Sequence, residues 1–414
     1  MIADHLWRTR CVILDAGVAP KFVGGLTRGR TGLVVDKELS EHRDALVAGD
    51  LKGAPVLELN AAPVTVGTLR EVGSFIRENG LQTVAGLGGG SVLDAVKLAA
   101  LFTADPSLTI FAERHAKRSG LLVLPPITNP KERPKTILMP STVGTGAEVS
   151  AVACLDTAVG RRLIVSRHLA GDVAVLDAGH LATLPKHLVF EGLLEAFLRV
   201  AGTMIGSKES IFDDDGHVLI QRIVRLGQRL TREDSPMLRL AAGQLSMETH
   251  TGWALMGRDP YGAKHWYLAS ELAYVTGARK MTATASVIGP IWEEIGKGAS
   301  AWGDTGRLQR LWSMVAAAEP HVDPDPVQGI KELMWRWGIT GLRHISEETL
   351  LQTTDATTRN WGGALPMLRG IDAHQIQHVL NTAAGGQHIL PRPSGQTSSG
   401  KGKEVNTHDQ QLST

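Results

Sequence analysis

Three consecutive glycines, followed by a serine and two spaced charged residues, form the most specific chemical pattern in this chain. They follow the apolar run Thr83–Leu87, which predicts a buried strand, and they precede a helical pattern that carries Asp94 and Lys97. Glycines let backbone N–H groups approach a phosphate, and the start of a helix adds its dipole. The pattern therefore predicts an anion site, whose candidate residues are Gly88, Gly89, Gly90, Ser91 and Asp94.

A second glycine-containing segment, Met139–Val149, lies about fifty residues further on. It offers hydroxyl groups and backbone donors in a short stretch with the spacing of a tight turn. We interpret it as a second wall of the same site, although a purely turn-forming role remains open. Its candidate ligand contacts are Ser141, Thr142, Thr145 and Gly146.

The two segments together resemble the iron-containing (group III) alcohol dehydrogenase family, which shares its fold with dehydroquinate synthase. That family carries a GGGSxxDxxK motif and then a PTTxGTGSE motif; here Ser141 replaces a Thr and Ala147 replaces a Ser. The resemblance extends over roughly residues 10 to 390. It implies that the first motif cradles the pyrophosphate of NAD(P), that the second also faces the cofactor, and that the backbone of Leu184 lies near it.

Asp36, at the end of the apolar run Thr31–Val35, bears on the choice of cofactor. The resemblance implies that this carboxylate faces the adenosine ribose, where it accepts a 2′-OH hydrogen bond and repels a 2′-phosphate. It therefore favours NAD over NADP. A simple helix-capping Asp is the competing interpretation of Asp36, and capping competes equally with cofactor binding for Asp94.

The metal site is where the chain departs from the resembled family. The family supplies one Asp and three His ligands to a divalent metal, a set that suits Fe(II) or Zn(II) and polarises the alcohol oxygen. By alignment, Leu194 and Leu198 stand at two of those positions, and the last ligand falls near Arg279 or Lys280. Only His265 is kept, so we expect no bound metal.

A rewired metal site is the alternative. Gly192-Leu193-Leu194-Glu195 also resembles the GLxE segment of the dehydroquinate synthase branch, whose Glu is a metal ligand. Glu195 and His265 would then need His250 as a third ligand, because catalytic zinc usually has three protein ligands.

Without a metal, a fixed positive charge is the simplest substitute. We predict that Lys280 or Arg279 stabilises a developing alkoxide, that His265 relays a proton, and that Glu195 orients one of them. The competing interpretations are a solvated basic pair for Arg279 and Lys280, and a buried core residue for His265.

Composition excludes several other classes of protein. The 414 residues carry a net charge of +1 with 21% charged residues, which argues against nucleic-acid binding. Cys11 and Cys154 form no disulfide or zinc pattern, and we expect both thiols to be buried. We expect a cytoplasmic protein without a signal peptide or a membrane span, because no apolar run approaches about 20 residues.

The order of predicted elements indicates an α/β N-terminal dinucleotide-binding domain followed by an all-α, dehydroquinate synthase-like domain. We place the domains at residues 1–185 and 186–391, with a disordered tail at 392–414. Residues 103–135, rich in proline and charge, predict a loop excursion. Seven strands are expected, at Cys11–Leu14, Thr31–Val35, Val56–Leu59, Thr83–Leu87, Thr136–Met139, Arg162–Val165 and Val173–Leu176.

The leading functional hypothesis is an NAD-dependent oxidoreductase that transfers hydride between the cofactor and an alcohol or carbonyl substrate, without the family's catalytic metal. Two alternatives are an oxidative, decarboxylating enzyme acting on a peptide C-terminus in natural-product biosynthesis, and an NAD-binding pseudoenzyme that supports a partner. A lyase of the dehydroquinate synthase type fits least, because it needs a metal. The resemblance also implies a homodimer formed through N-terminal edge strands, with a small-molecule or peptide substrate.

Overall fold

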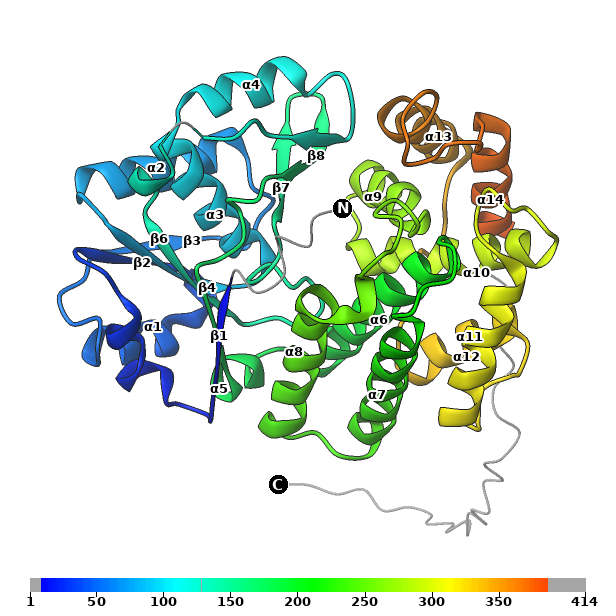
Figure 1. Cartoon of the computed structure of the whole chain (residues 1–414), viewed down its shortest axis with the longest axis horizontal. Helices are drawn as coiled ribbons and strands as arrows, with labels where there is room; N and C mark the ends of the chain where they lie inside the picture. The colour runs from blue at the N-terminus through cyan, green and yellow to red at the C-terminus, as the bar shows by residue number, and fades with distance from the viewer. Residues whose placement is uncertain (1–8, 128, 386–414) are drawn as a thin grey trace, which may run out of the picture.

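A six-stranded, fully parallel sheet forms the first half of the chain in the structure, a computed structural model that describes residues 9–127 and 129–385 (Figure 1). Its strand order is β1-β9-β6-β4-β2-β3, so the first and last strands are neighbours. All seven expected strands are present, six of them in this sheet. The six strands are β1 (Arg10–Leu14), β2 (Thr31–Asp36), β3 (Val56–Leu59), β4 (Thr83–Gly88), β6 (Lys135–Pro140) and β9 (Val173–Asp177).

Helices cover both faces of this sheet, which explains the continuous apolar runs of its strands. Val34 and Val84 point into the core beneath α2 (Val66–Glu78) and α3 (Gly90–Ala104), while Leu33 points to the opposite face. That opposite face is covered by the 3-10 turns at Ala19–Lys21, Val23–Leu26 and Lys37–Leu39, and by α1 (Ser40–Ala48); α5 (Ala178–Ala182) follows β9.

Residues 103–135 are not the loop that the prolines predicted. They contain α4 (Ser107–His115), strand β5 (Leu121–Val123) and a 3-10 turn at Pro130–Glu132. Strand β5 joins β8 (Gly160–Val165) and β7 (Val152–Thr157) in a separate three-stranded sheet of order β5-β8-β7. Pro106, Pro125, Pro126 and Pro134 lie outside these short elements and Pro130 begins the 3-10 turn, so no proline interrupts α4 or β5, and composition alone concealed both.

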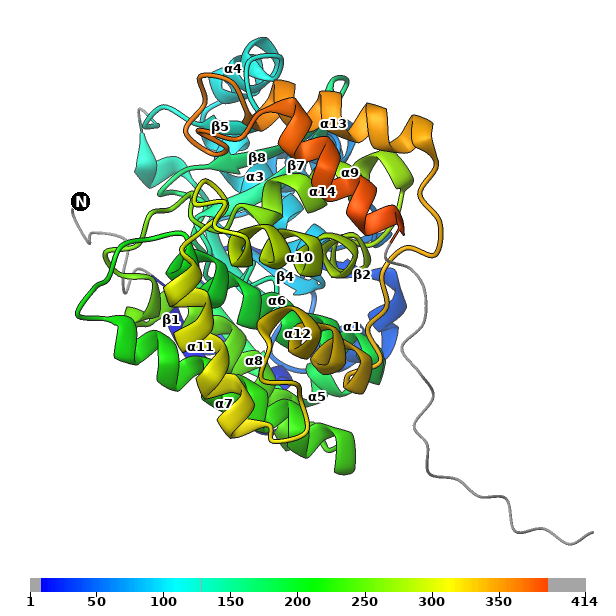
Figure 2. The same ribbon diagram turned by 90° about the vertical axis from the view of Figure 1, so that its right-hand side faces the viewer.

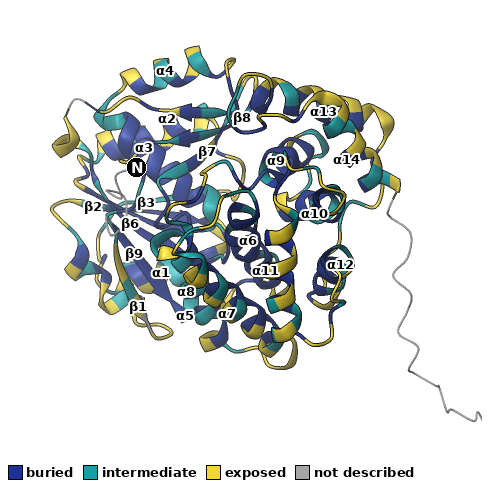
Figure 3. Ribbon diagram, turned by 45° about the vertical axis from the view of Figure 1, so that its right-hand side comes forward, coloured by how far each residue is buried: buried dark blue, intermediate teal, exposed yellow. Residues whose placement is uncertain are grey.

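In the described residues of the second half, the regular secondary structure is helical, and loops join the helices. Its core is built around α6, which Figure 3 shows buried along most of its length. Helix α13, rich in Thr and Glu, was not expected from the sequence. The helices are α6 (Lys186–Ile205), α7 (Asp213–Arg232), α8 (Pro236–Thr251), the 3-10 turn Trp253–Leu255, α9 (His265–Thr276), α10 (Lys280–Gly296), α11 (Thr305–Ala318), α12 (Pro326–Arg336), α13 (Glu347–Trp361) and α14 (Ala373–Gly385).

Helix α13 reaches across to the small sheet of the first half, as Figure 2 shows beside β5 and β8. The backbone N–H of Gly120 donates to the carbonyl of Asn360 at 2.7 Å. A side chain at Gly120 would overlap the indole of Trp361. The two halves of the chain are therefore joined at this edge by a hydrogen bond and a close packing contact.

Both cysteines are exposed, so the prediction of buried thiols is wrong. Cys154 lies on β7, an outer strand of the small sheet, where buried Ala153 and Leu155 alternate with it. Cys11 lies on β1, an outer strand of the large sheet. Apolar neighbours in the sequence misled the prediction, because successive residues of a strand point to opposite faces of the sheet and one of these faces can be open to water.

No single described helix is long and apolar enough to cross a membrane; α3 and α4 pass that test only as a pair, and they are bent by 118°. The tail at 392–414 lies outside the described residues.

Candidate active site between the two halves

The two glycine-containing segments meet at the carboxyl ends of β4 and β6. The backbone N–H of Ser141 donates to the carbonyl of Gly88 at 3.0 Å. A methyl group added at Gly89 would lie 3.2 Å from Thr142, and one added at Gly90 would lie 3.2 Å from Thr145. Larger residues in the first turn would therefore push the second turn away, which explains the glycines there.

This double turn fits a dinucleotide. Helix α3 begins at Gly90 with Gly89 as its N-cap, and no side chain caps its first-turn N–H groups. Those groups are available to a phosphate, and Ser91 stands beside them at the helix start. The hydroxyl oxygen of Thr142 is buried without a hydrogen-bond partner among the described residues. An unpaired buried hydroxyl at this point is a donor for a bound group.

Asp94 and Lys97 form a buried pair inside the first half. The Asp94 carboxylate lies 3.0 Å from the Lys97 ammonium and accepts a hydrogen bond from the Cys154 backbone N–H at 2.9 Å. Lys97 also donates to the carbonyl of Val152 at 2.6 Å. These contacts fasten α3 to β7, and they give both charged groups a structural role. A direct cofactor contact of Asp94 stays a prediction.

Asp36 and Leu184 have identifiable structural partners as well. The Asp36 carboxylate accepts a hydrogen bond from the Glu38 N–H at 3.2 Å and so caps the turn after β2. The Leu184 carbonyl accepts a hydrogen bond from Arg239 at 2.5 Å. Their cofactor contacts also stay predictions.

The second turn lies directly against α6 of the helical half. Gly144 has a φ of +104°, and an added Cβ there would lie 2.5 Å from the Cα of Gly192. Gly146, with a φ of +58°, has its missing side-chain position filled by the His250 ring. The Gly144 N–H also donates to the Ser246 hydroxyl at 3.0 Å. The turn at Ser141–Gly146 is thus in direct contact with α6 and α8 of the other half of the chain.

Glu195 lies between two cations one turn further along α6. Its carboxylate is 2.9 Å from the Lys280 ammonium and 3.5 Å from the Arg199 guanidinium. Burial alone would raise the pKa of Glu195, but Lys280 and Arg199 outweigh burial and lower it. The Lys280 ammonium additionally lies 4.2 Å from the centroid of the Trp266 ring, a cation–π contact. Glu195 is therefore ionised, and Lys280 is held in one place.

Arg199 links the Glu195–Lys280 pair to the turn at Ser141–Gly146. The sequence analysis did not identify Arg199 as a site residue. Its guanidinium donates to the Gly144 carbonyl at 2.5 Å and to the Thr249 hydroxyl at 2.7 Å. The Glu195-x-x-x-Arg199 spacing was a visible signal, because residues four apart share one helix face. The Lys280–Trp266 contact had no comparable local signal.

The structure separates the two basic residues that the sequence left undecided. Lys280 points to Glu195, whereas Arg279 pairs with Glu191 at 3.1 and 2.5 Å and is mostly exposed. Lys280 is thus the cation at the site, and Arg279 lies in a surface ion pair.

His265 is buried, His250 is half-buried, and both rings are neutral. Burial, helped by Lys280, lowers the pKa of His265 to about 3. Burial also lowers the pKa of His250 well below its usual value, with Arg199 and Lys97 adding to the effect. The Nε2 atom of each ring has no hydrogen-bond partner among the described residues. The His265 imidazole is therefore neutral, not a protonated cation, near neutral pH.

The described residues do not form the metal-ligand set of the resembled family. Leu194 and Leu198, at the two family ligand positions on α6, are fully buried in the helical core. Nowhere in residues 9–127 and 129–385 do three or more His, Cys, Asp or Glu side chains gather closely enough to hold an ion. The alternative set of Glu195, His250 and His265 is accordingly not assembled as a ligand cluster.

The parallel sheet with a glycine turn, closed by a helical half, defines an α/β plus all-helical architecture. Residues 20–178 match the family described as iron-containing alcohol dehydrogenase. The match covers less than half of the chain, and the fold of the whole chain is similar to that of a solved iron-containing alcohol dehydrogenase.

Similar proteins share the fold over nearly the whole chain but the sequence over a part of it. The chain is 30% identical over 215 residues to the probable alcohol dehydrogenase EutG of Escherichia coli, covering 50% of this chain and 51% of that one. It thus spans about half the length, or less, of the curated relatives it matches. Two solved structures are similar throughout: the iron-containing alcohol dehydrogenase of Thermococcus thioreducens (TM-score 0.73, 19% identity, 92% and 100% covered) and NADH-dependent butanol dehydrogenase A of Thermotoga maritima (TM-score 0.71, 18% identity, 91% and 97% covered).

Proposed function

We propose that this protein is an NAD-dependent oxidoreductase that interconverts an alcohol and a carbonyl compound without a catalytic metal. One observation carries the proposal: the Glu195–Lys280 pair and the double glycine turn are joined through Arg199 and the Gly144 carbonyl. The arrangement puts a fixed cation beside a dinucleotide-type turn.

Lys280, Glu195 and His265 each have a defined role in this proposal. NAD, when bound on the Gly88–Gly90 and Ser141–Gly146 turns, supplies the hydride acceptor. The Lys280 ammonium stabilises the alkoxide that forms as the alcohol loses its proton, and Glu195 holds that ammonium in position. Lys280 is partly exposed, so water takes up the proton. Neutral His265 is a hydrogen-bonding group rather than an acid.

The test of the cation compares two lysine variants on the same helix. Lys280→Met should lower kcat by about 10²–10³-fold, the usual cost of losing one alkoxide-stabilising donor. Lys297→Met is the matched control, because Lys297 lies on the surface at the end of α10 and pairs only with Glu293 and Glu294. A panel of alcohols and aldehydes with NAD(H) gives the rates. Equal turnover in wild type and Lys280→Met would overturn the role of Lys280.

Metal content and NAD binding test the rest of the proposal. Elemental mass spectrometry of the purified protein should find no stoichiometric zinc or iron, and one metal ion per chain would overturn the metal-free site. A titration should show NAD binding. Binding without hydride transfer to any member of the panel would favour the pseudoenzyme alternative instead.

The preference for NAD rests on Asp36. Its carboxylate is nearly buried at the end of β2, where it would repel a 2′-phosphate. Asp36→Ser should narrow the difference between NAD and NADP affinities. Equal affinities for both cofactors in the wild type would contradict the assignment.

We also propose a homodimer through the outer strand β1. Among the described residues this strand pairs with β9 on one edge only, and the proposal places a second copy on the other edge. Light scattering should give about twice the 44.3 kDa chain mass. A monomeric mass at assay concentration would rule the dimer out.

A further inference from the structure

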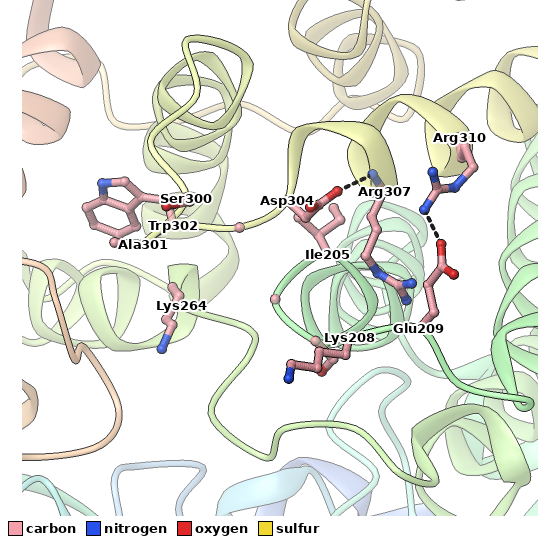
Figure 4. Close-up of a pocket in the computed structure, with 13 residues that line it drawn as sticks. Ile205, Lys208, Glu209, Lys264, Ser300, Ala301, Trp302, Asp304, Arg307 and Arg310 are labelled. Carbon is pink, nitrogen blue, oxygen red and sulfur yellow. Dashed lines mark hydrogen bonds and ion pairs between the residues drawn. The ribbon is translucent and has the colours of Figure 1, made fainter.

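A cavity of about 520 Å³ lies in the helical half, away from the glycine turns. It is bounded by the end of α6 and the turn after it, by the loop 300–304, and by the beginning of α11 (Figure 4). Lys264, just before α9, closes one side. The volume lies within the range of about 300–1,000 Å³ that small-molecule sites occupy.

The side chains that line this cavity carry a surplus of positive charge. Lys208, Lys264, Arg307 and Arg310 face two acidic residues, Asp304 and Glu209. Both acids are already engaged. Asp304 accepts a hydrogen bond from the Arg307 N–H at 2.8 Å as the N-cap of α11, and Glu209 pairs with Arg310 at 2.6 Å. Figure 4 draws both contacts.

A shared ion pair lies beneath the wall of the cavity and includes Arg307 of the lining. Arg307 donates to Asp213 at 2.9 and 3.1 Å, and Arg258 contacts the same carboxylate. Two guanidinium groups therefore share one negative charge. Burial alone would raise the pKa of Asp213, but hydrogen bonds from Arg307 and Arg258 outweigh it and lower the pKa to about 2. The Asp213 carboxylate is therefore ionised, and its single negative charge neutralises one of the two guanidinium charges that contact it.

Lys264 is a buried cation at the wall of this cavity. The residue is only 9% exposed, and its ammonium donates to the Met367 carbonyl, a neutral acceptor, at 2.7 Å. No carboxylate in the described part of the chain lies within 4 Å of this ammonium. Burial lowers the pKa of Lys264; Asp259 opposes that effect and Arg369 adds to it. A buried ammonium without a counter-ion is costly, and an anion placed beside it removes the cost.

We propose that this cavity binds a small organic oxyanion, a carboxylate or a phosphate ester, through Lys264 and Lys208. The site is distinct from the proposed hydride-transfer site. Ile205 at the cavity lies ten residues after Glu195 on α6, which is about 15 Å along the helix. Ile205, Ala301 and Trp302 supply apolar wall for a short carbon skeleton.

Calorimetry with NAD present at saturation tests the site, because NAD occupies the glycine turns and prevents the probes from reporting there. The probes are inorganic phosphate and succinate, with uncharged succinamide as the matched control for shape. We expect binding of the two anions and none of succinamide, and we expect affinity to fall as salt rises. Loss of one charged hydrogen bond should cost about tenfold in affinity in Lys264→Met.

Two further variants make the result decisive. Lys208→Met removes an exposed side chain whose loss leaves the fold intact, and it should also weaken succinate binding. Lys297→Met removes an exposed lysine outside the cavity and should bind succinate as the wild type does. Absence of anion binding to the wild type, or equal binding in wild type, Lys264→Met and Lys208→Met, would overturn the proposal.

A kinetic comparison separates the two sources of such an anion. If the oxyanion is the far end of the substrate, Lys208→Met raises KM for a carboxylate-bearing aldehyde and leaves KM for a neutral aldehyde unchanged. If it is a separate small molecule, both KM values stay the same while succinate binding weakens. The calorimetric result needs no turnover, so it stands apart from the success or failure of the proposed oxidoreductase activity.

Discussion

Replacing Arg199 by Met should destabilise the protein more than the replacement of a comparable surface arginine. The buried guanidinium contacts the Gly144 carbonyl at 2.5 Å, the Thr249 hydroxyl at 2.7 Å and the Glu195 carboxylate at 3.5 Å. Its removal leaves Glu195 with Lys280 alone and leaves two polar oxygens without their donor. Breaking a buried charge pair from one side costs about 3–5 kcal/mol, and the two short bonds to a charged donor give a similar figure of about 3–6 kcal/mol.

Urea denaturation followed by circular dichroism measures this loss. With an m-value of about 3 kcal/mol/M, the midpoint should fall by roughly 1 to 1.7 M. Arg222→Met is the matched control, because Arg222 is an exposed arginine on α7 that pairs with Glu248 at 3.4 Å. An exposed pair is worth only about 0.2–1 kcal/mol, so its midpoint should move by no more than about 0.3 M.

The cofactor gives a second measurement on the same variants. Arg199→Met should bind NAD more weakly, because the Gly144 carbonyl loses the contact that fixes the turn. Arg199→Lys should be intermediate, since one ammonium cannot reproduce a planar fork of donors. If Arg199→Met unfolds at the midpoint of Arg222→Met and binds NAD as the wild type does, the reasoning is refuted.

Three further outcomes are expected. Gly146→Ala should lose NAD affinity and at least about 1–2 kcal/mol of stability, because the residue has a φ of +58° and its Cβ would lie 2.1 Å from the His250 ring; Gly25→Ala, with open space around it, should do neither in the same titrations. Because the pKa of Asp213 is lowered to about 2, it should contribute about 2 kcal/mol that is present above pH 3.8 and lost as the pH falls towards 2; the urea midpoint of Asp213→Asn should lack this loss. The pKa of His265 is lowered to about 3, so stability should fall as the pH drops from 6.5 towards 3, and it should fall less steeply in His265→Asn, where His250 still contributes; an equally steep fall in the two proteins would contradict the assignment.

The sequence predicted those parts of the fold and site that depend on neighbouring residues. The turn at Gly88–Gly90 could be predicted because a strand, three glycines and a helix start follow one another directly. The departure from the family's ligand pattern at Leu194 and Leu198 was visible as well, and the metal-free site that it predicts stays a prediction. Helix α13 was missed because its Thr residues lower helix propensity, and packing on α9 and α14 decides its structure instead.

Contacts between distant residues could not be predicted. Glu195 and Lys280 are 85 residues apart, and only the packing of α10 on α6 and α9 brings them together. The exposure of Cys154 depends on β7 being an outer strand, which its own residues do not reveal. The buried state of His265 likewise follows from its position beside Gly202, where the absent side chain makes room for the imidazole.

The pairing of β1 with β9 has a consequence for how the chain folds as it is synthesised. Every strand of the large sheet lies before residue 178, so this sheet can close before the helical half has left the ribosome. The Gly144 turn is then formed but still lacks Gly192, Arg199 and His250, which pack against it later. The candidate site is therefore completed in two stages, and its second stage depends on residues that are translated after its glycine turns.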